Sequence, residues 1–272
     1  MVNGYTPTSL KEALEIRAAH DVIPYAGGTD LMIEEHRTGE YLFLNRVPEL
    51  KRIALEDGIL HLGAGCTFTE LIEHPLVPAL LKEALRLVAA PAIRNEGTIG
   101  GNIANGSAKA DSALIFFVAD ARLTLASVSG ERILPIKEFY LGRKRLALQS
   151  NELITEVLLP TQWLEHYYYQ KIGARKALAI SRTAFAGLIY IENDVIKHCA
   201  TAFGAVSDVI IRREDIDAML IGKNVAQVKE IKEAYLSAFE QAIIPIRGRV
   251  SAEYRKKVCL NLLNDFLSSY GI

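Results

Sequence analysis

Two glycine-containing segments of the sequence have the composition of a binding site for a phosphorylated ligand. The first reads Pro24-Tyr25-Ala26-Gly27-Gly28-Thr29-Asp30-Leu31 and follows an apolar stretch. Glycines lack a Cβ and let a ligand approach the backbone, and free N–H groups at the start of a helix favour phosphate. Thr29 adds a hydroxyl donor. The same residues also fit a tight strand-to-helix turn with a Thr or Asp cap, because a single Gly-Gly pair is weak evidence for binding.

The second segment reads Thr98-Ile99-Gly100-Gly101-Asn102-Ile103-Ala104-Asn105-Gly106-Ser107, and Asp111 follows it. Its side chains are small and form hydrogen bonds, and the Asp111 carboxylate is suited to accept from sugar or ribityl hydroxyls. A surface loop with Gly and Asn at left-handed positions is the alternative. Two such segments suit a long ligand such as a dinucleotide better than a single phosphate. No G-x-G-x-x-G motif is present, so an ordinary Rossmann domain is disfavoured.

Regular patterns on either side predict the elements that must position the first segment. Ser9 and Glu12 form a capping-box pattern that begins a short amphipathic helix. Residues 21–26 are typical of a buried strand that runs into Gly27-Gly28. A second helix from about Thr29 and a strand over residues 41–44 would complete a small βαβ-like unit.

The rest of the chain shows clear patterns except around the second segment. Asp57-Gly58 indicates a hairpin, Thr67 with Glu70 forms another capping box, and residues 78–89 have helical spacing. Residues 91–112 show neither helical nor strand periodicity, which predicts a long functional loop. Further elements are predicted as strands over 122–126, 131–134 and 153–159, a meander over 166–172, 183–191 and 195–206 that turns at Asn193-Asp194, and helices over 226–242 and 251–270.

The composition removes several classes of function. With 31 basic and 32 acidic residues among 272, the chain offers no basic field for nucleic acid and no membrane-surface anchor. Cys66, Cys199 and Cys259 are widely spaced and form no CxxC pair, which argues against a disulfide framework, a metal site or an iron–sulfur cluster in this chain. No signal peptide or spanning segment is apparent, so a cytoplasmic location is expected.

Five stretches of the sequence resemble one protein family, in that family's order. They are PYAGGTDLM, TIGGNIANGSAKADS, ILPIKEFYLGRKRLALQSNELITEVLLP, YQKIGARKALAI and SAEYRKKVCLNLL. The family is the FAD-binding (medium) subunit of molybdenum hydroxylases of the xanthine dehydrogenase and carbon monoxide dehydrogenase type. The resemblance implies an α+β chain with a two-subdomain FAD-binding fold of the vanillyl-alcohol oxidase and p-cresol methylhydroxylase type. That domain would span residues 1–160, with subdomains of about 1–52 and 53–160, and a smaller C-terminal domain would span 165–272.

The resemblance also implies roles for individual residues. The backbone from Ala26 to Leu31, beside Tyr25, would bind the FAD pyrophosphate. Thr98, Gly101, Asn102 and Ser107 would lie along the middle of the cofactor, and Asp111 would hold a hydroxyl of its sugar or ribityl portion. The backbone of Ile154 and the side chain of Lys171 would meet the polar edge of the isoalloxazine, with Arg175 in support. Without the resemblance, Lys171 and Arg175 are better interpreted as a solvated strand end.

The implied function is electron transfer without a catalytic side chain or a metal in this chain. Electrons would pass from a molybdenum-pterin large subunit, through a [2Fe–2S] small subunit, to FAD in this chain, and then to NAD⁺, a quinone or oxygen. Two departures from the family pattern are Ala108, where many members have Pro, and Val88, near the position where animal enzymes stack an aromatic ring on the flavin. A stand-alone flavin-dependent reductase of the same fold and a structural subunit with a degenerate flavin pocket are the alternatives.

Overall fold

The computed structural model describes residues 4–33, 39–246, 248 and 250–272. The chain divides into two compact units. Unit 1 contains Met1–Val77, Ala89–Gly106 and Asp120–Thr161, and unit 2 contains Pro78–Val88, Ser107–Ala119 and Gln162–Ile272. The chain therefore passes from one unit to the other more than once before residue 162. None of the described helices is long and apolar enough to cross a membrane.

A small parallel sheet begins unit 1, with the strand order β1-β3-β2. The Ser9 hydroxyl caps helix α1, but the Glu12 carboxylate accepts from the N–H of Thr8 rather than that of Ser9. The two strands of the expected βαβ-like unit are present as β2 and β3, which pair in parallel, but the described residues between them do not form the expected helix. In place of the helix expected from Thr29, the described residues form the 3₁₀ turn η1, and residues 34–38 lie outside the described part. The bounds are β1 Gly4–Tyr5, α1 Leu10–Ala19, β2 Val22–Tyr25, η1 Leu31–Ile33, β3 Glu40–Phe43 and the 3₁₀ turn η2 Pro48–Lys51.

A five-stranded antiparallel sheet forms the larger part of unit 1, in the order β4-β5-β10-β6-β7. The predicted hairpin is confirmed, because Asp57 and Gly58 adopt φ values of 47° and 76° between β4 and β5. The predicted strands at 122–126, 131–134 and 153–159 are present as well. The bounds are β4 Ile53–Glu56, β5 Ile59–Gly63, α2 Phe68–Glu73, β6 Arg122–Ser127, β7 Gly130–Pro135, α7 Ile136–Phe139, β8 Tyr140–Gly142, β9 Arg145–Leu146 and β10 Leu153–Pro160.

The expectation of a long loop over residues 91–112 is wrong. This part of the chain contains α4 (Pro91–Glu96), α5 (Ile99–Ala104) and the first residues of α6 (Asp111–Val118). Helices α4 and α5 have only six residues each, too few to show a helical period. Every residue of α6 is buried, so no polar face marks it as a helix.

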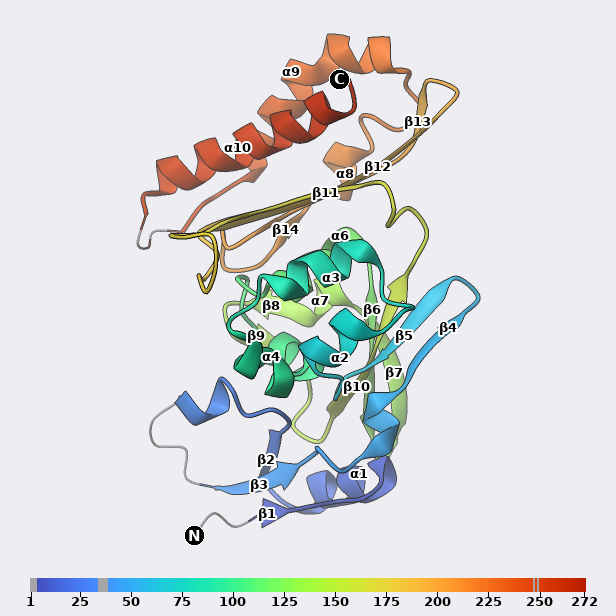
Figure 1. Cartoon of the computed structure of the whole chain (residues 1–272), viewed down its shortest axis with the longest axis vertical. Helices are drawn as coiled ribbons and strands as arrows, with labels where there is room; N and C mark the ends of the chain where they lie inside the picture. The colour runs from blue at the N-terminus through green and yellow to red at the C-terminus, as the bar shows by residue number, and fades with distance from the viewer. Residues whose placement is uncertain (1–3, 34–38, 247, 249) are drawn as a thin grey trace. The chain divides into compact units, whose positions relative to one another are not determined.

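Unit 2 is a four-stranded antiparallel sheet covered by helices on both faces, as its layers in Figure 1 show. Phe185 and Ile189 of β12 belong to a core shared with α10, and Gly187 between them faces the Phe266 ring. The alternate residues of β12 are also buried, on the face that packs against α6. The meander and its Asn193-Asp194 turn are confirmed. The bounds are α3 Ala79–Arg86, β11 Tyr167–Ile172, β12 Thr183–Glu192, β13 Val195–Gly204, β14 Ile211–Arg212, α8 Glu214–Asp217, α9 Val225–Ala242 and α10 Ala252–Ser269.

Candidate functional site

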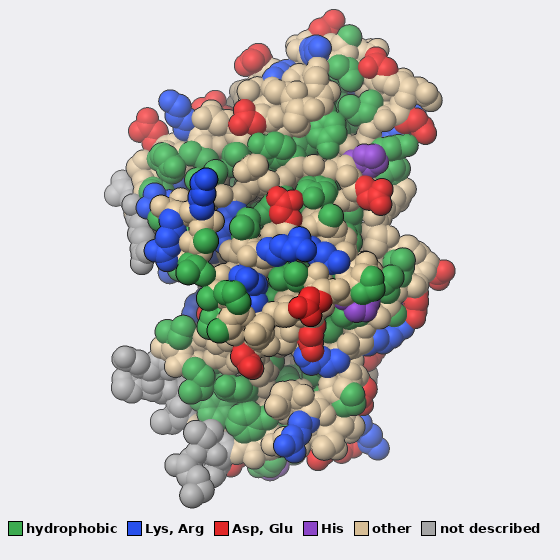
Figure 2. All heavy atoms as spheres, in the orientation of Figure 1, with side chains coloured by type: hydrophobic (Ala, Val, Ile, Leu, Met, Phe, Trp, Pro, Cys, Tyr) green, Lys and Arg blue, Asp and Glu red, His purple; other side chains and the backbone are tan. Residues whose placement is uncertain are grey.

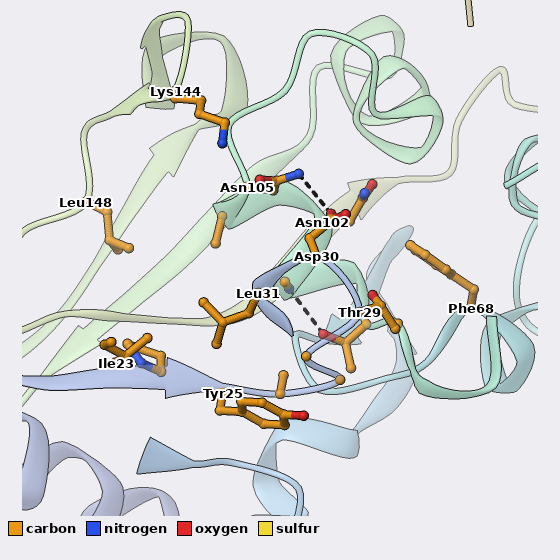
Figure 3. A pocket seen from close by; sticks show the side chains of 18 of the residues that line it. Ile23, Tyr25, Thr29, Asp30, Leu31, Phe68, Asn102, Asn105, Lys144 and Leu148 are labelled. Atoms are coloured by element: carbon orange, nitrogen blue, oxygen red, sulfur yellow. Dashed lines mark hydrogen bonds between the residues drawn. The ribbon is translucent and has the colours of Figure 1, made fainter. Parts of the chain in front are cut away.

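A cavity of about 350 Å³ in unit 1 is formed where the two glycine segments meet. Figure 3 shows side chains from both segments around it. Its volume lies within the usual range of ligand sites. The residues that line it are Arg17, Ile23, Pro24, Tyr25, Ala26, Gly27, Gly28, Thr29, Asp30, Leu31, Phe68, Gly97, Thr98, Gly101, Asn102, Ala104, Asn105, Lys144 and Leu148.

The first segment leaves β2 after Tyr25, whose carbonyl accepts from the N–H of Leu44 at 2.8 Å. The glycines here serve the protein's own packing. A Cβ on Gly27 would overlap the Glu96 carbonyl, and Gly28 has a φ of +66° with the Tyr25 ring against it. Gly27 therefore allows the turn to pack on the residues that precede the second segment, and is not explained by a ligand's approach.

The backbone N–H groups of the first segment are available to a ligand. From Gly27 to Leu31, five consecutive N–H groups donate to no acceptor within the described part of the chain, and all five residues line the cavity. Runs of unpaired backbone N–H groups are common anion-binding features, because several donors converge without any side chain. The backbone thus fits the pyrophosphate role expected for it.

The second segment differs, because its own fold uses its N–H groups. Thr98 caps α5, and its hydroxyl accepts from the Gly101 N–H at 3.1 Å. The N–H groups of Ile99 and Gly100 donate to the carbonyls of Cys66 and Ala64 at 3.1 and 2.9 Å. A Cβ on Gly100 would lie 2.6 Å from the Ala64 Cβ, whereas Gly101 is exposed at the cavity. The surface-loop interpretation is therefore wrong for these residues.

A side-chain hydrogen bond connects the two segments. The Asn105 amide donates to the Asp30 carboxylate at 2.8 Å, as the dashed line between them in Figure 3 shows. Together with the packing of Gly27 on Glu96, it fixes the distance between segments that are far apart in the sequence. Because the Asp30 carboxylate accepts a hydrogen bond from Asn105, it is held on the Asn105 side of the cavity.

Two cationic residues line the cavity that the sequence did not single out. Arg17 of α1 donates from Nη1 to the Val22 carbonyl, while its buried Nε has no hydrogen-bond partner. Lys144 belongs to the Arg143-Lys144-Arg145 turn, which by sequence alone resembles a solvated cluster. Its backbone N–H donates to Gly106 at 3.2 Å, which holds the turn beside the end of the second segment. Nothing local in the sequence marks either residue, because only the fold brings them to the glycine segments.

A buried ion pair in unit 2 joins two of the predicted site residues. Lys171 of β11 donates from Nζ to Asp111 Oδ2 at 2.7 Å and to the Leu87 carbonyl at 2.7 Å, and Ser181 donates to Asp111 Oδ1 at 2.6 Å. The side chains of Lys171 and Asp111 are only 8% and 7% exposed. The solvated-strand interpretation is therefore wrong for Lys171. Burial raises the pKa of Asp111, and Lys171 and Ser181 oppose that rise.

The remaining predicted residues lie at different places. Arg175 is exposed and donates to the carbonyls of Ala177 and Leu178, within the loop after β11. Ile154 is buried in β10, and the Ser107 hydroxyl accepts from the N–H of Lys109. Contact of FAD with Ser107, Asp111, Ile154, Lys171 and Arg175 stays a prediction, since none of them lines the unit 1 cavity.

Known proteins with the same architecture were found by sequence and by structure. The model of the FAD binding domain in molybdopterin dehydrogenase matches residues 1–162, and that of the CO dehydrogenase flavoprotein C-terminal domain matches residues 167–270. Carbon monoxide dehydrogenase from Hydrogenophaga pseudoflava superposes with a TM-score of 0.89 at 26% identity, over 97% of this chain and 95% of that one. Fold and cavity thus define the class as a two-domain α+β flavoprotein, which confirms the expected fold.

Similarity in sequence narrows the class to a family. A putative xanthine dehydrogenase FAD-binding subunit of Escherichia coli K12 is 34% identical over 89% of this chain and 86% of its own length. The nicotinate dehydrogenase FAD-subunit of Eubacterium barkeri is 30% identical over 93% of this chain and 90% of its own length. The chain therefore belongs to the FAD-binding medium subunits of the molybdenum hydroxylases, and it is an oxidoreductase subunit.

Proposed function

We propose that this chain receives electrons from a [2Fe–2S] subunit and passes them through FAD to NAD⁺ or another acceptor. The organic substrate would be oxidised on a molybdenum-pterin large subunit. When bound, FAD supplies a group that can take up electrons singly and give them up as a pair. The work of this chain is to hold that group, to exclude water from it and to set its potential. A cytoplasmic location stays a prediction.

The unpaired N–H groups from Gly27 to Leu31 are the observation that carries this proposal. A diphosphate brings two negative charges, and the cavity offers five backbone donors with Arg17 and Lys144 nearby. Hydrogen bonds to charged acceptors are each worth about 1.5–3 kcal/mol when the donors are already in place. A cavity with these donors is not degenerate, which argues against a purely structural subunit.

Lys171 would act on the potential of the bound flavin. Its amino group is positioned by Asp111 and by the Leu87 carbonyl, so it cannot rotate freely away from β11. A fixed positive charge beside the isoalloxazine stabilises the reduced, anionic form. We expect Lys171→Gln to lower the midpoint potential of bound FAD, while Lys176→Gln, an exposed neighbour in the loop after β11, leaves it unchanged.

The first experiment is the visible absorption spectrum of the purified chain after incubation with FAD, followed by anaerobic titration with NADH. We expect a bound flavin spectrum that bleaches with NADH. Bound flavin that stays oxidised would contradict NAD⁺ as the acceptor and direct the search to quinones or oxygen. A folded chain that binds no FAD would contradict the whole proposal.

A second assay separates the subunit from a stand-alone reductase. The FAD-loaded chain alone should fail to oxidise purines or aldehydes, and should be reduced by a partner's reduced [2Fe–2S] protein. Turnover of an organic substrate by the isolated chain would instead support the stand-alone enzyme.

A further inference from the structure

A second cavity, of about 300 Å³, lies within unit 2 beside the loop that follows β11. Its charged lining residues are all cationic, namely Lys109, Arg175, Arg182 and Arg255, and no Asp or Glu lines it among the described residues. Figure 2 shows Lys and Arg side chains gathered on the left of the view, at the height of this loop. In a chain with nearly equal numbers of acidic and basic residues, this separation of charge needs an explanation.

Arg255 is the most unusual of these cations because it is only 3% exposed. Its Nη1 donates to the carbonyls of Arg182 and Ala205, which connects α10 to the start of β12 and the end of β13, at one end of the sheet. Its Nε is buried without a hydrogen-bond partner, and no described carboxylate forms an ion pair with it. A buried charge that lacks a counter-ion is costly, so an anion in this cavity would stabilise the Arg255 guanidinium.

The other cations differ in whether their side chains already have partners in the protein. Arg175 already donates to the Ala177 and Leu178 carbonyls, so it mainly shapes the loop. Lys109 and Arg182 form no ion pair with any described residue. Lys109 follows Ser107 on the approach to α6, and the backbone N–H of Arg182 donates to the Ile172 carbonyl at 2.8 Å. Their charges are therefore held at the cavity from two separate segments.

Apolar residues complete the wall of the cavity. Leu178 is 53% exposed and Ile180 is 68% exposed, and both lie in the same loop as Arg175. Exposed aliphatic side chains beside cations suit a ligand with an anionic part and a flat apolar part. Ser181, at the end of this loop, is occupied with Asp111, whose charge is already balanced by Lys171.

We propose that this cavity binds a diphosphate group, with Lys109, Arg182 and Arg255 as its cationic partners. The diphosphate could be inorganic pyrophosphate or part of a nucleotide whose base lies on Leu178 and Ile180. Guanidinium groups match phosphate oxygens in geometry and keep their charge at all physiological pH values. Lys109, Arg182 and Arg255 do not line the unit 1 cavity, so this diphosphate site is separate from the one proposed for FAD there.

The test is calorimetric titration of the FAD-loaded full chain with inorganic pyrophosphate and, separately, with ADP. Loading with FAD occupies the other diphosphate site. We expect saturable binding that weakens at least about tenfold in Lys109→Gln and in Arg182→Gln, since each removes one charge-assisted contact. Lys197→Gln, an exposed lysine of β13 away from the cavity, is the matched control and should bind as the wild type does. Arg255 is not substituted, because it also donates hydrogen bonds to the Arg182 and Ala205 carbonyls and its loss would disturb the fold.

The outcomes separate the possible ligands. If ADP also binds and the cavity variants weaken its binding, the site takes the diphosphate of a nucleotide; if only pyrophosphate binds, the site takes the free anion. The proposal is overturned if the folded wild-type chain binds neither pyrophosphate nor ADP. It is also overturned if both cavity variants bind as the wild type does. A chain that takes up no FAD would contradict the proposed function alone, because the comparison of Lys109 and Arg182 variants with Lys197→Gln still reports on this cavity.

Discussion

The first glycine segment leaves five consecutive N–H groups unpaired at the cavity, whereas the second uses its N–H groups to build and anchor α5. Both segments are rich in glycine and small polar residues, so composition alone suggests the same role for them. Under the proposed function, the first segment binds the cofactor, while the second segment supports the fold. The role of each glycine in such a pair is therefore judged from the atoms that an added Cβ would contact.

The largest effect is expected for Gly27→Ala. The added Cβ would overlap the Glu96 carbonyl and push the two segments apart. Overpacking of this kind costs about 3 kcal/mol, and FAD affinity should fall about a hundredfold because the N–H groups move with the turn. Urea unfolding and fluorescence titration with FAD would measure both. Gly58→Ala is the control: its φ of 76° makes alanine costly to stability there, but Gly58 does not line the cavity, so FAD affinity should stay unchanged. If Gly27→Ala binds FAD as tightly as the wild type does, the first segment does not have the binding role that distinguishes it from the second.

Removal of FAD should affect the two segments unequally. At an FAD concentration of 100 times Kd, the loss of the cofactor lowers the free energy of unfolding by about 2.7 kcal/mol. Hydrogen exchange should accelerate at residues 27–31, because their N–H groups lose their only acceptors. Residues 99–102 should stay protected, since their acceptors belong to the protein. Mass spectrometry would measure the exchange rates. An equal increase in exchange rate in both segments would contradict the difference inferred between them.

The adjacent glycines of the second segment should respond differently to alanine. Gly100→Ala brings a Cβ against Ala64 and should lower the free energy of unfolding by about 2 kcal/mol. In Gly101→Ala the new Cβ meets only the Thr98 hydroxyl, so stability should change by less than about 0.5 kcal/mol while FAD affinity falls. Thermal unfolding and FAD titration of both variants test this. A larger stability loss in Gly101→Ala would refute it.

The smallest effects are expected for the two threonines. Thr98→Ala removes the cap of α5 and should cost about 1 kcal/mol in stability. Thr29→Ala should leave stability unchanged, because its hydroxyl has no partner among the described residues, and should weaken FAD binding a few-fold. Chemical unfolding with and without FAD distinguishes the two. If Thr29→Ala destabilises the FAD-free chain, its hydroxyl has a structural role.

Elements with a strong local pattern were predicted correctly. The Asp57-Gly58 hairpin and the Thr67–Glu70 capping box are decided by residues within a few positions of each other, so the sequence contains all the information. Helices α9 and α10 are long enough for their apolar spacing to be clear. The failure at residues 91–112 has the opposite cause, since short helices and a helix buried on every side have no period to detect.

The candidate site divides in the same way. The cavity is lined, among others, by Tyr25 to Leu31 and by Thr98, Gly101 and Asn102, which the sequence singled out because they lie in two contiguous segments. Arg17 and Lys144 were missed because they reach the cavity from α1 and from a distant turn. The partner of Lys171 was missed for a related reason, since only the packing of α6 on the unit 2 sheet brings Asp111 to β11.

The interleaving of the two units has a consequence for synthesis of the chain. Helix α6 is buried along its whole length against β12 and β13, yet it leaves the ribosome long before those strands do. At about 5–20 residues per second, this apolar helix waits several seconds for the sheet that covers it. A gene fragment that stops near residue 160 would leave α6 uncovered permanently. We therefore expect residues 1–160 expressed alone to aggregate, because the apolar surface of α6 stays exposed.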